Sequence, residues 1–341
     1  MNTITNKEYN KLKFEQLPWI EKYKPQTVDQ LYISENLKSR FKYFIQNPNS
    51  MSNLILTGSH GIGKTSSIRC IGKELYGKYY ENYVLELNMS DNKSSKIIQN
   101  DIINFCKLKL IYQDQDIKKY APFKLIILDE ADNIENRIQP QLESIMELYN
   151  KSVKFVFTCN TSYNLIEIIQ SRCLILIYVS SNELITDKLK KIVKTENIKY
   201  DDEALEQICK LSYGDMRSSI NILQLIHNMH KCIKLEYVND IYDLPQQIII
   251  KKLFEAIIKK NLKLSFNIIN ELKQKGYSGS DIVLGIIKTL RSDICNDIPE
   301  NIKIDIFEIA SISSYNISKS FDSTLQIYGC VCELVDKIKI E

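Results

Sequence analysis

The stretch Gly58-Ser59-His60-Gly61-Ile62-Gly63-Lys64-Thr65, followed by Ser66, decides how the chain folds. It carries the pattern G-x-x-x-x-G-K-[ST] between an apolar run at 53–56 and a segment with helical spacing. Glycines let the backbone turn successive N–H groups inward, and the helix that follows adds its own unsatisfied N–H groups. We therefore predict a phosphate-binding loop from Gly58 to Ser66, in which Lys64 reaches the β- and γ-phosphates and Thr65 ligates Mg²⁺. The alternative is an ordinary glycine-rich turn before a helix.

The composition is that of a globular protein with room for two or three domains. The chain has 341 residues, of which 44% are hydrophobic, and its formal net charge of +3 requires any nucleic-acid binding to come from a local surface. Its nine cysteines form no pair of C-x-x-C motifs, which argues against zinc. We find neither a signal-peptide core nor an apolar stretch of membrane-spanning length, so we expect a soluble intracellular protein with no membrane partner.

Alternating apolar runs and helical patterns predict an α/β domain with a parallel five-stranded sheet covered on both faces. The expected strands are 53–56, 83–87, 124–128, 154–159 and 174–178, and the expected helices are 29–46, the one from Ser66, 94–110, 139–149 and 164–169. Polar residues follow the carboxyl ends of several strands, where sheets of this kind bind ligands.

The strand signal stops at Ser181, and the rest of the chain is predicted to be helical. Three short helices at 182–197, 201–212 and 215–230 form a small helical unit. About five amphipathic helices fill 246–341, with breaks near Asn261, 275–277, 298–299 and 311–314. The resulting domains are a frayed N-terminus at 1–16, an α/β domain at 17–179, a helical lid at 180–243 and a helical domain at 244–341.

Asp129 and Glu130 end the third predicted strand after four apolar residues. Asp129 is expected to hold Mg²⁺, and Glu130 to polarise a water that attacks the γ-phosphate. The alternative is a pair of solvated surface carboxylates.

Three further polar residues each have two interpretations. Asn160 either contacts the attacking water or the γ-phosphate, or belongs to a simple turn. Arg217 either closes on the γ-phosphate from the helical unit or pairs with Asp215 at a helix end. Arg172 lies too far along the sheet edge to reach its own nucleotide, so it is either an arginine finger for a neighbouring subunit or an ordinary surface arginine.

The segment at 17–25 holds the only tryptophan, Trp19, together with Tyr23 and two prolines. It is either a strap that packs on the core or a clamp against the base of a bound nucleotide.

These motifs, taken in order, closely resemble the small subunits of replication factor C, the eukaryotic sliding-clamp loader among the AAA+ ATPases. The matching stretches span about 260 residues, and Ser171-Arg172-Cys173 is particular to clamp-loader ATPases. They are the segments 18–25, 58–65, 85–88, 128–132, 159–162, 170–173, 214–217 and 276–278. Within the family, Gly61-Ile62-Gly63 and the segment 146–149 look most like the subunit called 2 in animals and 4 in budding yeast.

The resemblance implies a RecA-like AAA+ domain, a lid, a C-terminal collar for oligomerisation, and ATP with Mg²⁺ as ligands. It implies that Asn160 is the first sensor, Arg217 the second sensor and Arg172 the finger that acts in trans, and that Ile20 and Lys24 line the base side of the nucleotide. The implied partners are other loader subunits in a hetero-pentamer, a sliding clamp and the backbone phosphates of primer–template DNA. The implied location is the nucleus, or a viral or cytoplasmic replication compartment.

The sequence also departs from the family pattern on the side that would couple to DNA. Glu143 and Ser144 stand where paired arginines are usual, and Gln99 stands where an arginine commonly faces DNA. Lys93 and Lys96 keep positive charge there and are our candidate DNA contacts. The other function classes are a different AAA+ DNA machine, such as a branch-migration helicase or an initiator, and a non-hydrolysing structural subunit.

Overall fold

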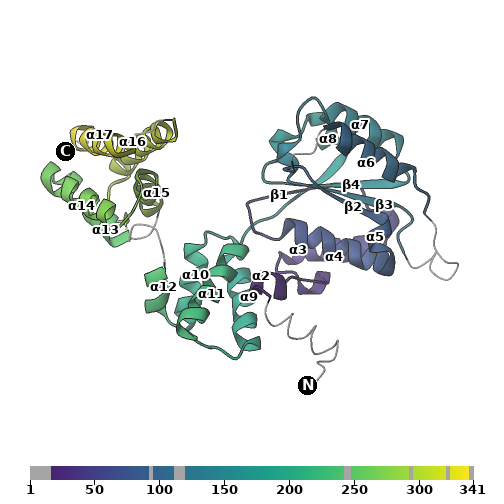
Figure 1. Cartoon of the computed structure of the whole chain (residues 1–341), viewed down its shortest axis with the longest axis horizontal. Helices are drawn as coiled ribbons and strands as arrows, with labels where there is room; N and C mark the ends of the chain where they lie inside the picture. Colours follow the sequence, from purple (N-terminus) through teal and green to yellow (C-terminus); the bar gives the residue numbers. More distant parts are fainter. Residues whose placement is uncertain are drawn as a thin grey trace, which may run out of the picture. The chain divides into compact units, whose positions relative to one another are not determined.

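The computed structural model describes residues 17–91, 95–110, 120–241, 247–291, 295–319 and 323–337. The chain divides into two compact units, Met1–Ile241 and Tyr242–Glu341 (Figure 1). The first unit contains the phosphate loop and is the one that positions the candidate site.

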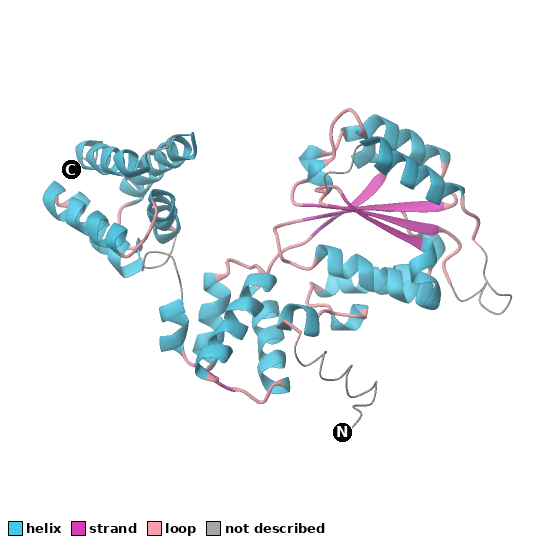
Figure 2. Cartoon of the chain, viewed as in Figure 1, coloured by secondary structure: helices cyan, strands magenta, loops and turns pink. Residues whose placement is uncertain are grey.

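A sheet of five parallel strands in the order β2-β3-β4-β1-β5 forms the centre of the first unit (Figure 2). The strands are β1 (Asn53–Thr57), β2 (Val84–Asn88), β3 (Lys124–Asp129), β4 (Val153–Cys159) and β5 (Cys173–Ile177). In the register, Leu54 of β1 lies opposite Val156 of β4 on one side and Leu174 of β5 on the other. The three strands β3, β4 and β1 are therefore adjacent, and their carboxyl ends meet at one edge of the sheet.

Helices cover both faces of this sheet, as the continuous apolar strands predict. Helices α6, α7 and α8 lie on one face and α3, α4 and α5 on the other (Figure 1). Alternate residues of β1 point to opposite layers, since Leu54 and Leu56 belong to the apolar cluster that includes α3 and α4, and Ile55 to the cluster that includes α6 and α7. The helices of the two layers are α3 (Glu35–Gln46), α4 (Lys64–Tyr76), α5 (Tyr80–Tyr83), α6 (Ser95–Lys107), α7 (Gln139–Leu148) and α8 (Glu167–Ser171).

A helical subdomain, which we call the lid, follows the sheet in the first unit. It contains α9 (Asn182–Thr195), α10 (Asp202–Leu211), α11 (Met216–His230) and α12 (Leu235–Ile241), and its apolar core also takes in Trp19 of α2 (Trp19–Lys22). The N-terminal strap of the chain therefore packs with the lid, although about 160 residues separate them along the chain.

The second unit is a bundle of helices around its own apolar core. Its helices are α13 (Gln247–Ile258), α14 (Leu262–Gln274), α15 (Gly279–Leu290), α16 (Glu300–Lys319) and α17 (Ser323–Lys337). Ser278 caps α15 in a capping box, in which the Ser278 hydroxyl and the Asp281 carboxylate bond reciprocally to each other's backbone N–H groups. No helix in the described part of the chain is long and apolar enough to cross a bilayer.

Five details of the predicted elements were wrong. In place of the helix expected at 164–169, the chain forms a 3₁₀ turn, η5 (Ser162–Asn164), followed by α8. The lid contains a fourth helix, α12, after the three that were expected. The helix expected at 29–46 begins only at Glu35, after a 3₁₀ turn, η1 (Val28–Gln30). The lid contains two short parallel strands, β6 (Lys199–Tyr200) and β7 (Cys232–Ile233), which were not predicted because neither lies in an apolar run of strand length. The break expected at 311–314 is absent, because α16 runs through it.

Candidate active site

The phosphate loop connects β1 to α4, as the sequence predicts. Gly61 and Gly63 have φ angles of +65° and +93°, a region in which L side chains are strained. A Cβ on Gly61 would lie 1.8 Å from Oδ1 of Asp215, the N-cap of α11 in the lid. Glycine is thus required at position 61 both by the turn and by the close approach of the lid.

Lys64 begins α4 and turns its side chain back along the loop. Its ammonium donates to the carbonyls of Gly58 at 2.6 Å and Ser59 at 2.7 Å, and to Oδ1 of Asn160 at 3.1 Å. Burial lowers the pKa of Lys64, an effect that the Asp132 and Asp129 carboxylates oppose. The ammonium is therefore held by neutral oxygens at the place where phosphate oxygens would stabilise its charge.

Asp129 and Thr65 supply the oxygens of the candidate metal site. The Thr65 hydroxyl donates to Asp129 Oδ1 at 2.8 Å, and the Thr158 hydroxyl donates to the same carboxylate oxygen. A carboxylate and a hydroxyl in contact are hard oxygen ligands of the type that Mg²⁺ takes together with waters and phosphate oxygens. The two residues predicted as metal ligands thus lie within hydrogen-bonding distance of each other and fit the ion.

Glu130 follows Asp129 with a φ of +54°, which is uncommon for a residue with a side chain. Its backbone N–H donates to Asp129 Oδ1 at 3.2 Å, and its side chain is exposed and lines the cavity above the loop. Its carboxylate interacts with the described residues only through a long contact of 3.5 Å from Asn133 Nδ2. The turn thus directs one carboxylate of the pair toward Thr65 and leaves the other open to solvent in the cavity.

Asn160 follows β4, which lies between β3 and β1 in the sheet. Its backbone N–H donates to Asp132 Oδ2 at 2.7 Å, and its side chain accepts from Lys64. The Thr57 hydroxyl at the end of β1 donates to its carbonyl at 3.1 Å. Asn160 therefore lies in a braced turn that carries its side chain to Lys64, and its role as a sensor stays a prediction.

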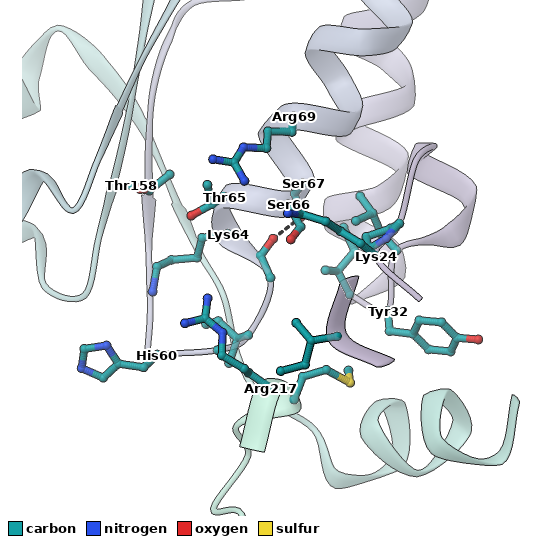
Figure 3. Close-up of a pocket in the computed structure, with 18 of the residues that line it drawn as sticks. Lys24, Tyr32, His60, Lys64, Thr65, Ser66, Ser67, Arg69, Thr158 and Arg217 are labelled. Atoms are coloured by element: carbon teal, nitrogen blue, oxygen red, sulfur yellow. Dashed lines mark hydrogen bonds between the residues drawn. The ribbon is translucent and has the colours of Figure 1, made fainter. Parts of the chain in front are cut away.

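These groups face a cavity of about 730 Å³ between the loop, the strap and the lid (Figure 3). Its lining includes the predicted residues Ile20, Lys24, His60, Gly61, Ile62, Gly63, Lys64, Thr65, Ser66, Asp129, Glu130, Asn160 and Arg217. Gly58 and Ser59 contribute through the carbonyls that hold Lys64. A cavity of this size fits a nucleoside triphosphate.

Arg217 reaches this cavity from the first turn of α11 in the lid (Figure 3). The alternative ion pair with Asp215 is not formed, because the Asp215 carboxylate accepts the backbone N–H groups of Arg217 at 2.7 Å and Ser218 at 3.1 Å. Within the described ranges the guanidinium of Arg217 has no carboxylate partner, so it is free to meet an anion.

Trp19 does not clamp a base. Its side chain is 7% exposed, and its ring stacks on His227 of the lid with centroids 5.3 Å apart. Its backbone N–H donates to Gln224 at 2.9 Å, and Lys22 and Tyr23 of the same segment both bond to Glu196. The segment is a strap fastened to the lid, and the residues it presents to the cavity are Ile20, Glu21, Tyr23, Lys24 and Pro25.

Arg172 lies at the opposite end of the sheet from the phosphate loop. It directly precedes β5, and its carbonyl is 3.5 Å from the side-chain amide of Asn53, the first residue of β1. Because β1 and β5 are parallel, the five residues of β1 separate Arg172 from the loop, which is roughly 16 Å of extended chain. Its guanidinium pairs with Glu143 at 2.6 Å and Glu147 at 3.4 Å.

Of the candidate DNA contacts, Lys93 lies outside the described residues. Lys96 lies in α6 and has no described side chain, and the same holds for Gln99. Of the residues that depart from the family pattern, Glu143 faces Arg172 and Ser144 donates to the carbonyl of Pro140 at 3.1 Å.

Two polar residues of the site were missed in the sequence. Asp132 holds the backbone of Asn160 and Thr161, and Thr158 bonds to Asp129. Thr158 could have been found from the register, since Leu128 pairs with Phe157 and the next residues, Asp129 and Thr158, must then be neighbours. Asp132 had no such signal, because only the folded turns bring it to β4.

Comparison with known proteins first identifies the class of ATPase to which the chain belongs. Residues 54–181 match the model of the AAA family of ATPases associated with various cellular activities, and residues 187–226 match an AAA+ ATPase lid domain of the replication factor C type. Two solved structures of the RuvB Holliday junction branch migration motor of Thermotoga maritima, one of them a mutant, share the fold, with TM-scores of 0.52 and 0.53 at 17% and 15% sequence identity. Each alignment covers 69% of this chain, and 80% and 79% of the respective solved chains. The protein is an ATPase of the AAA class.

The particular family follows from the rest of the chain. Residues 245–333 match the replication factor C C-terminal domain. Replication factor C subunit 4 of Saccharomyces cerevisiae is 34% identical over 94% of this chain and 96% of its own length, and subunit 2 of Arabidopsis thaliana is 31% identical over 98% and 95%. The chain belongs to the replication factor C small-subunit family. The likeness to the branch-migration motor, below 20% identity, shows the shared fold alone, so that alternative is not favoured.

Proposed function

We propose that this chain is an ATP-hydrolysing subunit of a sliding-clamp loader, which helps to open a ring-shaped polymerase clamp and place it on primer–template DNA. The whole-length relatedness to replication factor C small subunits supports the assignment. The proposed partners are further loader subunits in a hetero-pentamer, the clamp, and DNA phosphates. The proposed location is the nucleus or another replication compartment.

One observation carries the proposal: the phosphate loop and Arg172 lie at opposite ends of adjacent parallel strands. A chain built this way cannot bring its own Arg172 to its own γ-phosphate, but in a ring it can offer Arg172 to the next subunit. If a neighbouring subunit completes the ATP site, ATP binds the assembled ring and the separate subunits with different affinities. Only such a difference lets nucleotide shift the equilibrium between assembled and separate subunits, as a clamp loader requires.

In the proposed reaction, ATP lies in the cavity with its phosphates on the loop and its base toward the strap. Lys64 binds the β- and γ-phosphates. Thr65 and Asp129 would hold Mg²⁺, which would neutralise phosphate charge. Glu130, which is open to the cavity, accepts a proton from the attacking water. Asn160 positions that water or the γ-phosphate. Arg217 reaches the γ-phosphate from the lid.

The proposed domain division places the ATPase domain at 17–179, the lid at 180–243 and the collar at 244–341. The separate apolar clusters of the sheet, the lid and the second unit support it.

The test is reconstitution of the loader with this chain and its co-purifying partners. We expect ATP-dependent loading of the clamp onto primed circular DNA, measured as clamp retained on the DNA after gel filtration, and loss of loading when this subunit is omitted. Failure of the chain to co-purify with loader subunits, or loading that is unaffected by its omission, contradicts the proposal. A turnover assay on the same complex separates an active subunit from a structural one.

A further inference from the structure

Beside the loop and the strand ends, the cavity is lined by several apolar and aromatic side chains, together with the polar residues Glu21, Lys24 and Gln30. The apolar and aromatic side chains come from three segments far apart in the chain, namely the strap, the stretch after η1, and the lid, and they include Ile20, Tyr23, Tyr32, Ile33 and Ile220. Figure 3 shows Tyr32 and Lys24 on the opposite side of the cavity from Lys64 and His60. A lining of this kind suits a flat, weakly polar group such as a nucleobase.

One cation, Lys188 of α9, is buried in this lining. It exposes only 9% of its surface, and its ammonium donates to the carbonyl of Tyr23 at 2.8 Å. The same nitrogen lies 5.2 Å from the ring centre of Tyr32 and 6.0 Å from that of Tyr23. An ammonium has three N–H donors, so one is used and two remain.

Lys188 has no carboxylate within ion-pair distance anywhere in the described residues, although a buried cation is costly without partners. Burial, with a smaller contribution from Lys191, lowers the pKa of Lys188 to about 8. Lys190 of the same helix differs, since it pairs with Asp202 at the surface at 2.8 Å. In the described part of the chain, two N–H donors of Lys188 therefore have no protein acceptor, and Lys188 lines the cavity in which a ligand would lie.

We propose that Lys188 recognises the purine base of the bound nucleotide by donating an N–H to a ring nitrogen. The proposal rests on the proposed function, in which this cavity binds ATP. Purine ring nitrogens have in-plane lone pairs that can accept the unused N–H groups of Lys188. The rings of Tyr23 and Tyr32 lie beside the Lys188 ammonium. Because Lys188 lies on the lid and bonds to the strap, occupation by a base would tie lid, strap and nucleotide together.

The test compares ATP with inorganic tripolyphosphate, which offers the phosphates without the nucleoside, by calorimetry on the full chain. For Lys188→Met we expect ATP and ADP affinity to fall equally, by about tenfold or more, as for a lost hydrogen bond to a charged group. Tripolyphosphate affinity is expected to stay unchanged. The matched control is Lys190→Met on the same helix, which should bind all three ligands as the wild type does.

An unchanged ATP affinity in Lys188→Met, or an equal loss for tripolyphosphate, overturns the proposal. A smaller loss for dATP than for ATP would assign the contact to the ribose and overturn it as well. Should Lys188→Met not fold, the wild-type protein is tested with 1-deaza-, 3-deaza- and 7-deaza-ATP. We expect one of them to bind about tenfold more weakly, and equal binding of all three overturns the proposal. Wild-type protein that binds tripolyphosphate and ATP equally well overturns the base contact alone, whereas binding of neither overturns the proposed function.

Discussion

The hydroxyl of Thr65 donates to the carboxylate of Asp129 at 2.8 Å, which joins the first turn of α4 to the end of β3. The same carboxylate oxygen accepts from Thr158 and from the backbone N–H of Glu130. Three hydrogen bonds from three segments thus fix one oxygen beside the phosphate loop. We expect Mg²⁺ to enter with little rearrangement of Asp129, because its position is set before the ion binds.

The first prediction concerns the ion. In Asp129→Asn, ATP affinity should lose most of its dependence on Mg²⁺, because the substitution removes the negative ligand and keeps the shape of the side chain. The measurement is ATP binding by the full chain with Mg²⁺ and with EDTA. Thr158→Val, which removes a hydrogen bond to Asp129 but no ligand, serves as the control and should keep a clear Mg²⁺ dependence. Equal Mg²⁺ effects in Asp129→Asn and the wild type would contradict the assignment.

Lys64→Ala should abolish tight ATP binding. The ammonium of Lys64 is the cation of the loop itself, and the structure holds it by Gly58, Ser59 and Asn160 at the phosphate position. Equilibrium binding of a fluorescent ATP analogue measures the effect, with Lys73→Ala on the outer part of α4 as a control. Retention of wild-type affinity in Lys64→Ala would show that the loop binds nucleotide in some other way.

Glu130→Gln should keep nucleotide affinity and lose turnover, by about 10²-fold or more, as for removal of a general base. The reason is geometric, since Asp129 engages Thr65 while the Glu130 side chain is open to the cavity. Binding and steady-state hydrolysis are measured on the same reconstituted complex. An equal loss of binding in Glu130→Gln and Lys64→Ala would end this division of roles.

The strands were predictable from the sequence to within about one residue, because buried parallel strands read as continuous apolar runs. The ends of helices were less so. Ser311 to Ser314 resembled a break, but the Ser311 hydroxyl donates to the Phe307 carbonyl at 2.7 Å and Ser313 is buried in the bundle. A serine whose hydroxyl bonds to the carbonyl of the preceding turn is compatible with a continuous helix. The sequence alone does not distinguish such a serine from one that caps or ends a helix.

Some residues of the candidate site were likewise predictable from the sequence, and others were not. The loop, Asp129 and Glu130 were found because each lies in a local pattern next to a strand. Trp19 was ambiguous, since its partners Gln224 and His227 are about 200 residues away and only the folded lid brings them together. Lys188 had no local signal, because a lysine in an amphipathic helix is normally solvated and its burial depends on the strap.

DNA binding by the assembled loader should be electrostatic and independent of sequence, with Lys93 and Lys96 among the residues that bind phosphate. Removing one lysine–phosphate interaction should reduce the log–log salt slope by about 0.9 for duplex DNA. Affinity of the Lys93→Ala, Lys96→Ala double variant is measured between low and moderate salt. The control is the pair Lys38→Ala and Lys42→Ala on α3, which removes the same amount of charge elsewhere. Unchanged affinity and slope in the Lys93, Lys96 variant would show that this segment does not face DNA.

The last prediction tests Arg172, whose guanidinium contacts Glu143 and Glu147 through one nitrogen, Nη2. Among the residues that the structure describes, both carboxylates approach this one nitrogen, which leaves the Nε and Nη1 donors of the guanidinium available for an anion from a neighbouring subunit. Because the loop of the same subunit lies at the other end of β1, Arg172→Ala should leave the ATP affinity of its own subunit unchanged. Turnover at the adjacent site should fall, by roughly 10³-fold or more if Arg172 acts as other arginine fingers do.

The experiment mixes Arg172→Ala chain with wild-type partners and measures ATP binding by the isolated variant and DNA-stimulated hydrolysis by the complex. Arg137→Ala is the matched control, because Arg137 is also an exposed arginine paired with a glutamate but lies on the turn before α7. Glu143→Gln adds a second readout: it loosens the guanidinium without removing it, so it should lower turnover less than Arg172→Ala and leave assembly intact. Loss of ATP binding by the isolated Arg172→Ala chain would place the arginine in its own site, against the sheet geometry. Full hydrolysis by the mixed complex would make it an ordinary surface residue.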